Sequence, residues 1–173
     1  MNRSILKLAI PNIISNITIP LLGLIDMILM GHLGDATYIG AIALGGTIFS
    51  VLYSFFSFLR AGTTGFTAQA LGSGNNTETI YSLYRSLCIG IPIIILILAT
   101  QIPIARLSNL LLDGSDEVKA LAIEYFFIRI WAAPANIMLY CLNGWFVGMQ
   151  NTKIPMLIAI LINVTHIIFS IFF

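Results

Sequence analysis

Charged side chains are scarce in this sequence of 173 residues, where Asp, Glu, Lys and Arg together make up 9%. A soluble domain usually carries about 25%. The scarcity excludes an ordinary water-soluble enzyme and a disordered tail, because a soluble chain of this size needs more charge on its surface. The net charge is only +1, so the sequence offers no basic patch for binding nucleic acid.

Cysteine and catalytic motifs are scarce as well. The two cysteines, Cys88 and Cys141, lie in apolar runs and are predicted to be small buried hydrophobes, not a disulfide or a metal site. The Gly62-Thr-Thr-Gly65 segment lacks the lysine of a phosphate-binding loop. Neither histidine has a cysteine or a second histidine at metal-ligand spacing. We therefore expect no enzyme activity, no cofactor and no metal site.

What the sequence does contain is apolar residues, at 58% of the chain, gathered into uncharged runs. The runs cover residues 8–25, 37–59, 86–105, 130–152 and 154–173. Each is about as long as the ~20 residues that a helix needs to cross a bilayer. In lipid the backbone must satisfy its own hydrogen bonds, which favours helices. We predict an all-α integral membrane protein, one domain over residues 1–173, with about five transmembrane helices near 5–33, 37–72, 81–106, 117–149 and 153–173.

The distribution of Lys and Arg predicts the orientation. Cytoplasmic segments of membrane proteins carry an excess of these residues. If the N-terminus is cytoplasmic, the outer segments contain only Arg106 and Lys119, and the cytoplasmic segments contain Arg3, Lys7, Arg60, Arg85 and Lys153. We therefore expect a multi-pass protein of the cell (inner) membrane with a cytoplasmic N-terminus.

Short polar and small residues mark helix ends and contacts. The run Gly72-Ser-Gly74-Asn75-Asn76 predicts a turn, and Ser115 is a candidate N-cap before two acidic residues. Small residues four apart allow two helix backbones to approach closely in lipid. An equally good explanation for any one pair is that glycine is common in membrane helices. The pairs are Ala41/Gly45, Gly46/Ser50 and Gly144/Gly148.

Asp26 is the strongest single indication of function. It follows a long uncharged run and falls in the outer half of the first expected helix. A carboxylate at that depth costs ~2.5–3.5 kcal/mol on insertion scales, so it normally faces a polar cavity, pairs with a cation or carries a proton. Asp26 is thus a candidate proton carrier. The alternative is that it lies at the outer interface and is simply hydrated.

Pro11 and Pro20 lie in the same expected helix. Each removes a backbone hydrogen bond, and Asn16 and Thr18 offer polar groups near the break. Broken helices of this kind often line transport sites, although a static kink fixed by packing explains the prolines equally well.

Four further polar residues are candidates for an ion or proton site. His166 and Ser170 are four apart in the last expected helix and share a face, and a histidine can exchange protons near neutral pH. Tyr125 and Asn143 lie in the fourth expected helix. The alternatives are a histidine hydrogen-bonded to a neighbouring helix, a tyrosine anchored at the interface, and an asparagine that only joins helices.

Three blocks of this sequence resemble the MATE (multidrug and toxic compound extrusion) transporters, in the DinF-like branch. The first block runs from Pro11 through Pro20 to Asp26 and on to Gly31-His-Leu-Gly34. The second is Phe58-Leu-Arg-Ala-Gly-Thr-Thr-Gly-Phe-Thr-Ala-Gln-Ala-Leu-Gly72, and the third is Arg129-Ile-Trp-Ala-Ala-Pro134 with Asn143-Gly-Trp-Phe-Val-Gly148. The blocks follow the family order and spacing.

The resemblance implies a transporter that uses a proton or sodium gradient to expel organic, often cationic, compounds. Family members have two six-helix lobes, and the substrate passes between them. The matching positions assign cation coupling to Asp26 and helix bending to Pro11. The implied partners are small organic substrates, the lipid bilayer and a second lobe or another copy of the chain.

The sequence departs from the family pattern in two ways, and these affect the expected coupling ion and the expected number of helices. The fifth-helix Asn and Asp of many members align with His166 and Ser170, so a second carboxylate is missing. That disfavours a sodium site, because a hard cation needs several oxygen ligands, while Asp26 and His166 could still carry protons. Tyr125 and Asn143 fall on positions that join this cluster in some members.

The second departure is that only about five helices are expected. The chain is thus a fragment, a truncated gene product or part of an assembly. The alternative function is a non-transporting membrane remnant or an interaction module.

Overall fold

The computed structural model describes residues 9–11, 13–14, 17 and 36–172, and these residues are helical apart from short turns. The prediction of an all-α fold is confirmed for this part of the chain. Most of the first expected helix, including Asp26 and Pro20, lies outside the described residues. The elements are α2 (Ala36–Phe55), α3 (Ser57–Gly72), α4 (Asn76–Ala99), α5 (Gln101–Leu111), α6 (Asp116–Arg129), η1 (Ile130–Ala132), α7 (Ala133–Gly148) and α8 (Lys153–Phe172).

Three of these segments are long and apolar enough to cross a membrane, judged by length and composition. They are Thr37–Gly72, Asn76–Ala99 and Asp116–Gly148. Within the described residues, Lys153–Phe169 of α8 forms a shorter apolar helix. The full set of five spans stays a prediction.

Three of the expected long helices, near 37–72, 81–106 and 117–149, are interrupted where side chains or prolines disturb the backbone hydrogen bonds. Between α2 and α3, the Ser54 and Ser57 hydroxyls donate to the carbonyl oxygens of Ser50 and Ser54, and serines that bond back in this way bend helices. The α4–α5 break at Thr100 precedes Pro103, and the 3₁₀ turn η1 precedes Pro134. A proline cannot donate the backbone hydrogen bond that would continue the helix.

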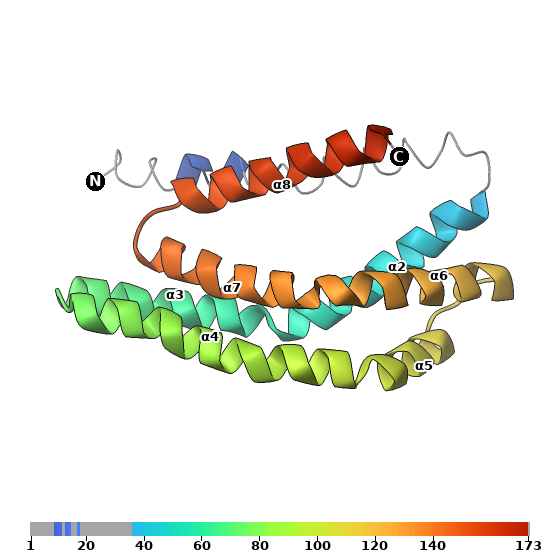
Figure 1. Cartoon of the computed structure of the whole chain (residues 1–173), viewed down its shortest axis with the longest axis horizontal. Coiled ribbons are helices and arrows are strands. Elements are labelled where there is room, and N and C mark those ends of the chain that lie inside the picture. The colour runs from blue at the N-terminus through green and yellow to red at the C-terminus, as the bar shows by residue number, and fades with distance from the viewer. Residues whose placement is uncertain (1–8, 12, 15–16, 18–35, 173) are drawn as a thin grey trace.

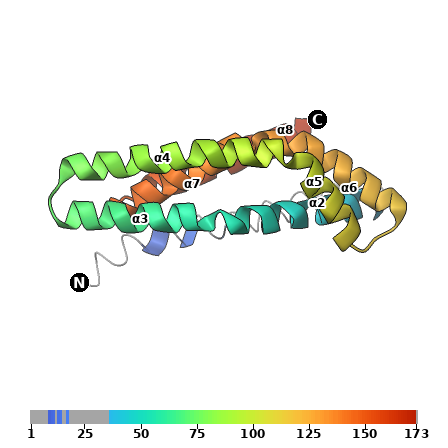
Figure 2. The same ribbon diagram turned by 90° about the horizontal axis from the view of Figure 1, so that it is seen from below.

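The helices pack as a bundle of three, α3, α4 and α7, with a second pair, α2 and α6, beside it. α3 packs most extensively on α7 and on α4, α4 also contacts α7, and α2 pairs with α6. Figure 1 shows α6, η1 and α7 running as one long rod above α3 and α4, with α8 on the other side of α7. Figure 2 shows α3 and α4 side by side and antiparallel, joined at one end by their short turn.

The α3–α7 contact is close because α7 presents glycines. A Cβ atom added to Gly144 would lie 2.6 Å from the carbonyl oxygen of Arg60, and one added to Gly148 would lie 2.6 Å from the Cβ of Thr67. Larger side chains therefore cannot occupy these positions without moving α3. The close-packing interpretation is confirmed for this pair but fails for Gly46, whose added Cβ would meet nothing within 4 Å.

Small polar groups join α3, α4 and α7 along this contact. The hydroxyls of Thr67 and Ser82 lie 2.7 Å apart, and the Trp145 indole N–H donates to the carbonyl oxygen of Thr79 at 2.8 Å. The Cys141 thiol donates to the carbonyl oxygen of Ser86 at 3.3 Å. Such bonds hold membrane helices together where lipid offers no hydrophobic driving force.

The two cysteines differ. Both are free, and Cys141 is buried as predicted. The prediction of burial is wrong for Cys88, because its position on α4 faces away from α3 and α7 and leaves it exposed.

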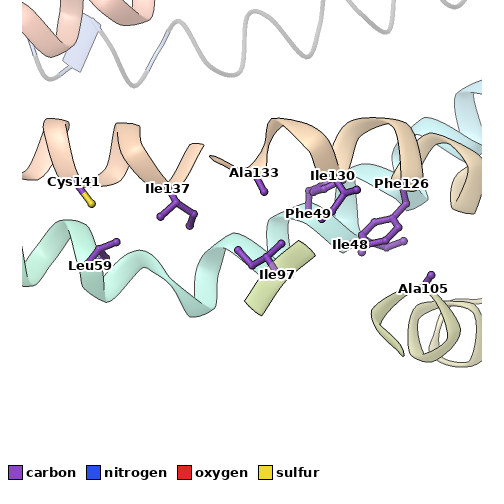
Figure 3. Close-up of a cluster of buried hydrophobic side chains, with 10 residues drawn as sticks. All are labelled: Ile48, Phe49, Leu59, Ile97, Ala105, Phe126, Ile130, Ala133, Ile137 and Cys141. Atoms are coloured by element: carbon purple, nitrogen blue, oxygen red, sulfur yellow. The ribbon is translucent and has the colours of Figure 1, made fainter. Parts of the chain in front are cut away.

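The apolar core lies where α2 and the α6–α7 rod meet α3, α4 and α5. Its members are shown in Figure 3, and Phe126, Ile130 and Ile137 have no exposed surface. Many large apolar side chains are exposed outside it, including Phe55, Phe66 and Leu110. A surface of this kind suits contact with lipid more than with water.

The turns follow the sequence signals. The Asn75 side chain accepts from the backbone N–H of Glu78 at 3.0 Å, and Gly74 has a positive φ of 70°. Ser115 accepts from the backbone N–H of Val118 at 3.4 Å, so the predicted N-cap is confirmed. Gln150, after α7, also has a positive φ, at 59°.

Candidate functional site

The predicted site residues lie on three different helices. Tyr125 is in α6, Asn143 is in α7, and His166 and Ser170 are in α8. Pro11 is helical and buried. Asp26 and Pro20 lie outside the described residues, so their predicted roles in coupling and bending stay predictions.

Tyr125 is held in an aromatic and cationic cluster. Its ring covers Gly45 of α2 and meets the Phe49 ring edge-on, with centroids 6.4 Å apart. The Arg129 guanidinium donates to the Tyr125 hydroxyl and lies 5.1 Å from the Phe49 ring centroid and 5.4 Å from that of Tyr125. A second cation would be repelled by the guanidinium at this point, so the geometry favours a packing role for Tyr125.

The Asn143 side chain has a buried oxygen that makes no hydrogen bond within the described part of the chain. This atom is Oδ1, and the side chain as a whole is half-buried. Leaving a buried acceptor unsatisfied costs about 1–3 kcal/mol, so this oxygen is suited to a donor or a cation that binds during the protein's work.

Tyr125 and Asn143 cannot line one compact ion site together. They are eighteen residues apart on the α6–η1–α7 rod, which at 1.5 Å per residue separates them by about 27 Å. The expected cluster therefore contains at most one of them. The resemblance to the family placed both in the cluster position by position, and the structure separates them because α6, η1 and α7 continue as one rod.

On α8 the buried polar residue is Asn163, whereas His166 is exposed. The Asn163 side chain is 7% exposed, and its Nδ2 has no hydrogen-bond partner in the part of the chain that the structure describes. Asn163 is thus a candidate that was not among the residues predicted from the sequence.

A polar and aromatic stripe along the α6–α7 rod was not predicted. Asn136 Nδ2 donates to the Tyr53 hydroxyl at 3.2 Å, and the Tyr53 and Tyr140 rings lie edge-on with centroids 6.4 Å apart. Spacings of four, seven, four and three residues place its members on one face of the rod: Tyr125, Arg129, Asn136, Tyr140 and Asn143. The spacing of these polar and aromatic residues at three, four and seven positions was the signal in the sequence that could have predicted the stripe. The stripe combines a guanidinium at one end with rings and amides further along, and an aromatic face can bind an organic cation.

Among the residues that the structure describes, no group of three or more His, Cys, Asp and Glu is placed to hold a metal ion. The site candidates among the described residues are therefore amides, hydroxyls and an imidazole.

Comparison with known protein families shows which family this chain belongs to. The MatE family model matches residues 11–172. The chain belongs to the MatE family. This membership agrees with the resemblance to MATE transporters and with the expectation of a membrane transport protein that is not an enzyme.

Curated relatives of this MatE chain agree with the match. DNA damage-inducible protein F of Escherichia coli is 35% identical over 170 residues, which cover 98% of this chain and 37% of the relative. Multidrug resistance protein MdtK of Yersinia enterocolitica is 28% identical over 170 residues, which cover 94% of this chain and 36% of the relative. The MatE chain thus spans less than two-fifths of the length of these relatives.

Proposed function

We propose that this MatE chain forms part of an exporter that moves organic, often cationic, compounds out of the cell across the inner membrane. The observation that carries the proposal is the family match over residues 11–172, supported by 35% identity to the E. coli relative. Three apolar helices long enough to cross a membrane are consistent with it. The orientation proposed has the N-terminus in the cytoplasm.

The proposed driving force is a cation gradient, with protons the favoured ion. Asp26 would take up and release the proton, and the first helix would bend at Pro11 and Pro20 as it does so. Protonation removes a charge from a low-dielectric cavity, which shifts the balance between two conformations. His166 would serve as a second proton-exchanging group, and Ser170 supplies no carboxylate for sodium.

The substrate surface is proposed to include Asn136, Tyr140 and Asn143 of the stripe on the α6–α7 rod, together with Tyr53 of α2, but not the end of the stripe at Arg129, which would repel a cation. The rings of Tyr53 and Tyr140 offer faces for stacking and for cation–π contact, and Asn136 and Asn143 offer hydrogen bonds. A second lobe or another copy of the chain would complete the pathway, because transporter sites form between repeats.

The test is efflux of a fluorescent cationic dye from vesicles that contain the intact protein. An imposed pH gradient should drive efflux, and Asp26→Asn should reduce it to the level of protein-free vesicles. His32→Gln is a matched control, because it changes an ionisable residue outside the proposed coupling set. If efflux persists at the full rate in Asp26→Asn, the proposed coupling role of Asp26 is wrong.

The same assay separates the ions and the alternative function. Efflux driven by a sodium gradient alone, at constant pH, would contradict proton coupling. An absence of efflux with either gradient, from protein that is correctly inserted, would favour the non-transporting membrane protein.

A further inference from the structure

A groove on the outer surface of the α3–α4 pair has the features of a lipid site. Its cavity volume is about 240 Å³. It is mostly apolar, with Phe58, Phe66 and Ile89 among its exposed walls, and Gly62 leaves part of its floor open. Arg85 is the one charged residue among its lining side chains in the described part of the chain.

The groove lies at a membrane boundary. Arg60 and Arg85 end two of the long uncharged runs, one on each helix. The Thr67–Ser82 hydrogen bond fixes the antiparallel register of α3 and α4. At 1.5 Å per residue, this register puts Arg60 and Arg85 within about 6 Å of each other in depth. Phe58 and Ile89 then lie about 6–9 Å to the membrane side of Arg85.

Arg85 is the group left to bind an anion. The hydroxyls of Thr63, Ser82 and Ser86 donate to backbone carbonyl oxygens of their own helices. The Arg85 side chain is 65% exposed and forms an ion pair with Glu78. A guanidinium has five N–H donors, so the pair with one carboxylate leaves donors for another anion.

We propose that this groove binds an anionic phospholipid, with an acyl chain along Phe58, Gly62 and Ile89 and the phosphate on Arg85. The apolar wall toward the membrane and the cation at its boundary match the two ends of such a lipid. Basic pockets between transmembrane helices are known to bind lipid head groups in this way. Glu78 competes with the phosphate for Arg85, so it weakens the site. This proposal does not depend on the transport activity.

The groove can be blocked without disturbing the fold. A Cβ atom added to Gly62 or to Gly65 would meet nothing within 4 Å, but only Gly62 lines the groove. Gly62→Leu should therefore fill the acyl-chain position, and Gly65→Leu is its matched control. Arg85→Gln removes the phosphate ligand, and Arg106→Gln removes an exposed arginine at the other end of the bundle as its control.

The experiment measures binding of dioleoyl phosphatidylglycerol and dioleoyl phosphatidylcholine to the delipidated intact protein by native mass spectrometry. We expect Arg85→Gln to reduce the preference for phosphatidylglycerol about five-fold, the effect of one arginine near an anionic surface. Glu78→Gln should increase that preference. Gly62→Leu should reduce the occupancy of both lipids, and both controls should match the unaltered protein.

Three results would overturn the proposal. The first is a preference for phosphatidylglycerol that Arg85→Gln leaves unchanged. The second is equal occupancy in Gly62→Leu and Gly65→Leu. The third is displacement of the lipid by millimolar inorganic phosphate, which would indicate a free-anion site. If the groove is instead covered by a second lobe or another copy, Gly62→Leu will break that association and leave lipid occupancy unaltered.

Discussion

At the scale of single residues, glycines in equivalent sequence contexts have different roles. Gly144 and Gly148 allow α7 to approach α3, and Gly45 makes room for the Tyr125 ring. Gly46 and Gly65 face open space, although they too lie in apolar helices. The effect of a glycine on helix packing therefore depends on which atoms of another helix lie opposite it.

We predict that Gly144→Leu destabilises the protein by about 1–3 kcal/mol, because the new side chain would overlap the Arg60 carbonyl group. The melting temperature in mild detergent should fall by several degrees. Gly46→Leu is the control, and it should leave the melting temperature unchanged or raise it, since leucine favours helix more than glycine does. Equal losses in the two variants would contradict the close α3–α7 contact.

At the scale of elements, α3 and α7 end with the same hydrogen-bond pattern but with different residues. After α3, Asn75 N–H donates to the Ala70 carbonyl oxygen and the positive-φ residue is Gly74. After α7, Asn151 N–H donates to the Phe146 carbonyl oxygen and the positive-φ residue is Gln150. This cap normally uses glycine, because other residues are strained at positive φ. The second cap therefore stores strain that the first does not.

We predict that Gln150→Gly stabilises the protein by about 0.5–1 kcal/mol, since glycine adopts this backbone conformation without steric cost. Thermal denaturation in detergent is the measurement. Asn151→Gly, one position further on, should give no gain, because only Gln150 in this turn has a positive φ. A lower melting temperature in Gln150→Gly would show that its side chain matters more than its backbone.

At the scale of the whole molecule, the helices alternate between two ends. The turns after α3 and α7 lie at one end, and the turn between α5 and α6 lies at the other (Figure 1). The proposed orientation places the first end in the cytoplasm, since it carries Arg60, Arg85 and Lys153.

We predict that a cysteine placed at Asp113 reacts with a membrane-impermeant maleimide in intact cells, whereas one at Ser73 reacts only after permeabilisation. Both positions are exposed in turns. Cys88 and Cys141 would first be replaced by alanine, so that each variant carries one thiol. The reverse labelling pattern would overturn the cytoplasmic N-terminus.

Much of the fold could be predicted because its signals are local. The uncharged runs predicted apolar helices, Ser115 predicted a cap, and the run around Gly74 predicted a turn. The candidate site could be predicted only in part. Residue type pointed to Tyr125 and Asn143, but they are about 27 Å apart because α6, η1 and α7 continue as one rod and do not fold back. Asn163 was not among the predicted site residues, because burial cannot be read from polarity.

The sequence by itself determined that this is a helical membrane protein of the MatE family, because hydropathy and local motifs act through neighbours along the chain. The tertiary structure alone decided which glycines form a close contact, that the Tyr125 ring packs on Gly45 and Phe49 of α2, and that α3 and α4 enclose a groove with Arg85 at the membrane boundary. These features depend on the register and spacing between packed helices. Packing between side chains sets that register, and no single stretch of residues contains it.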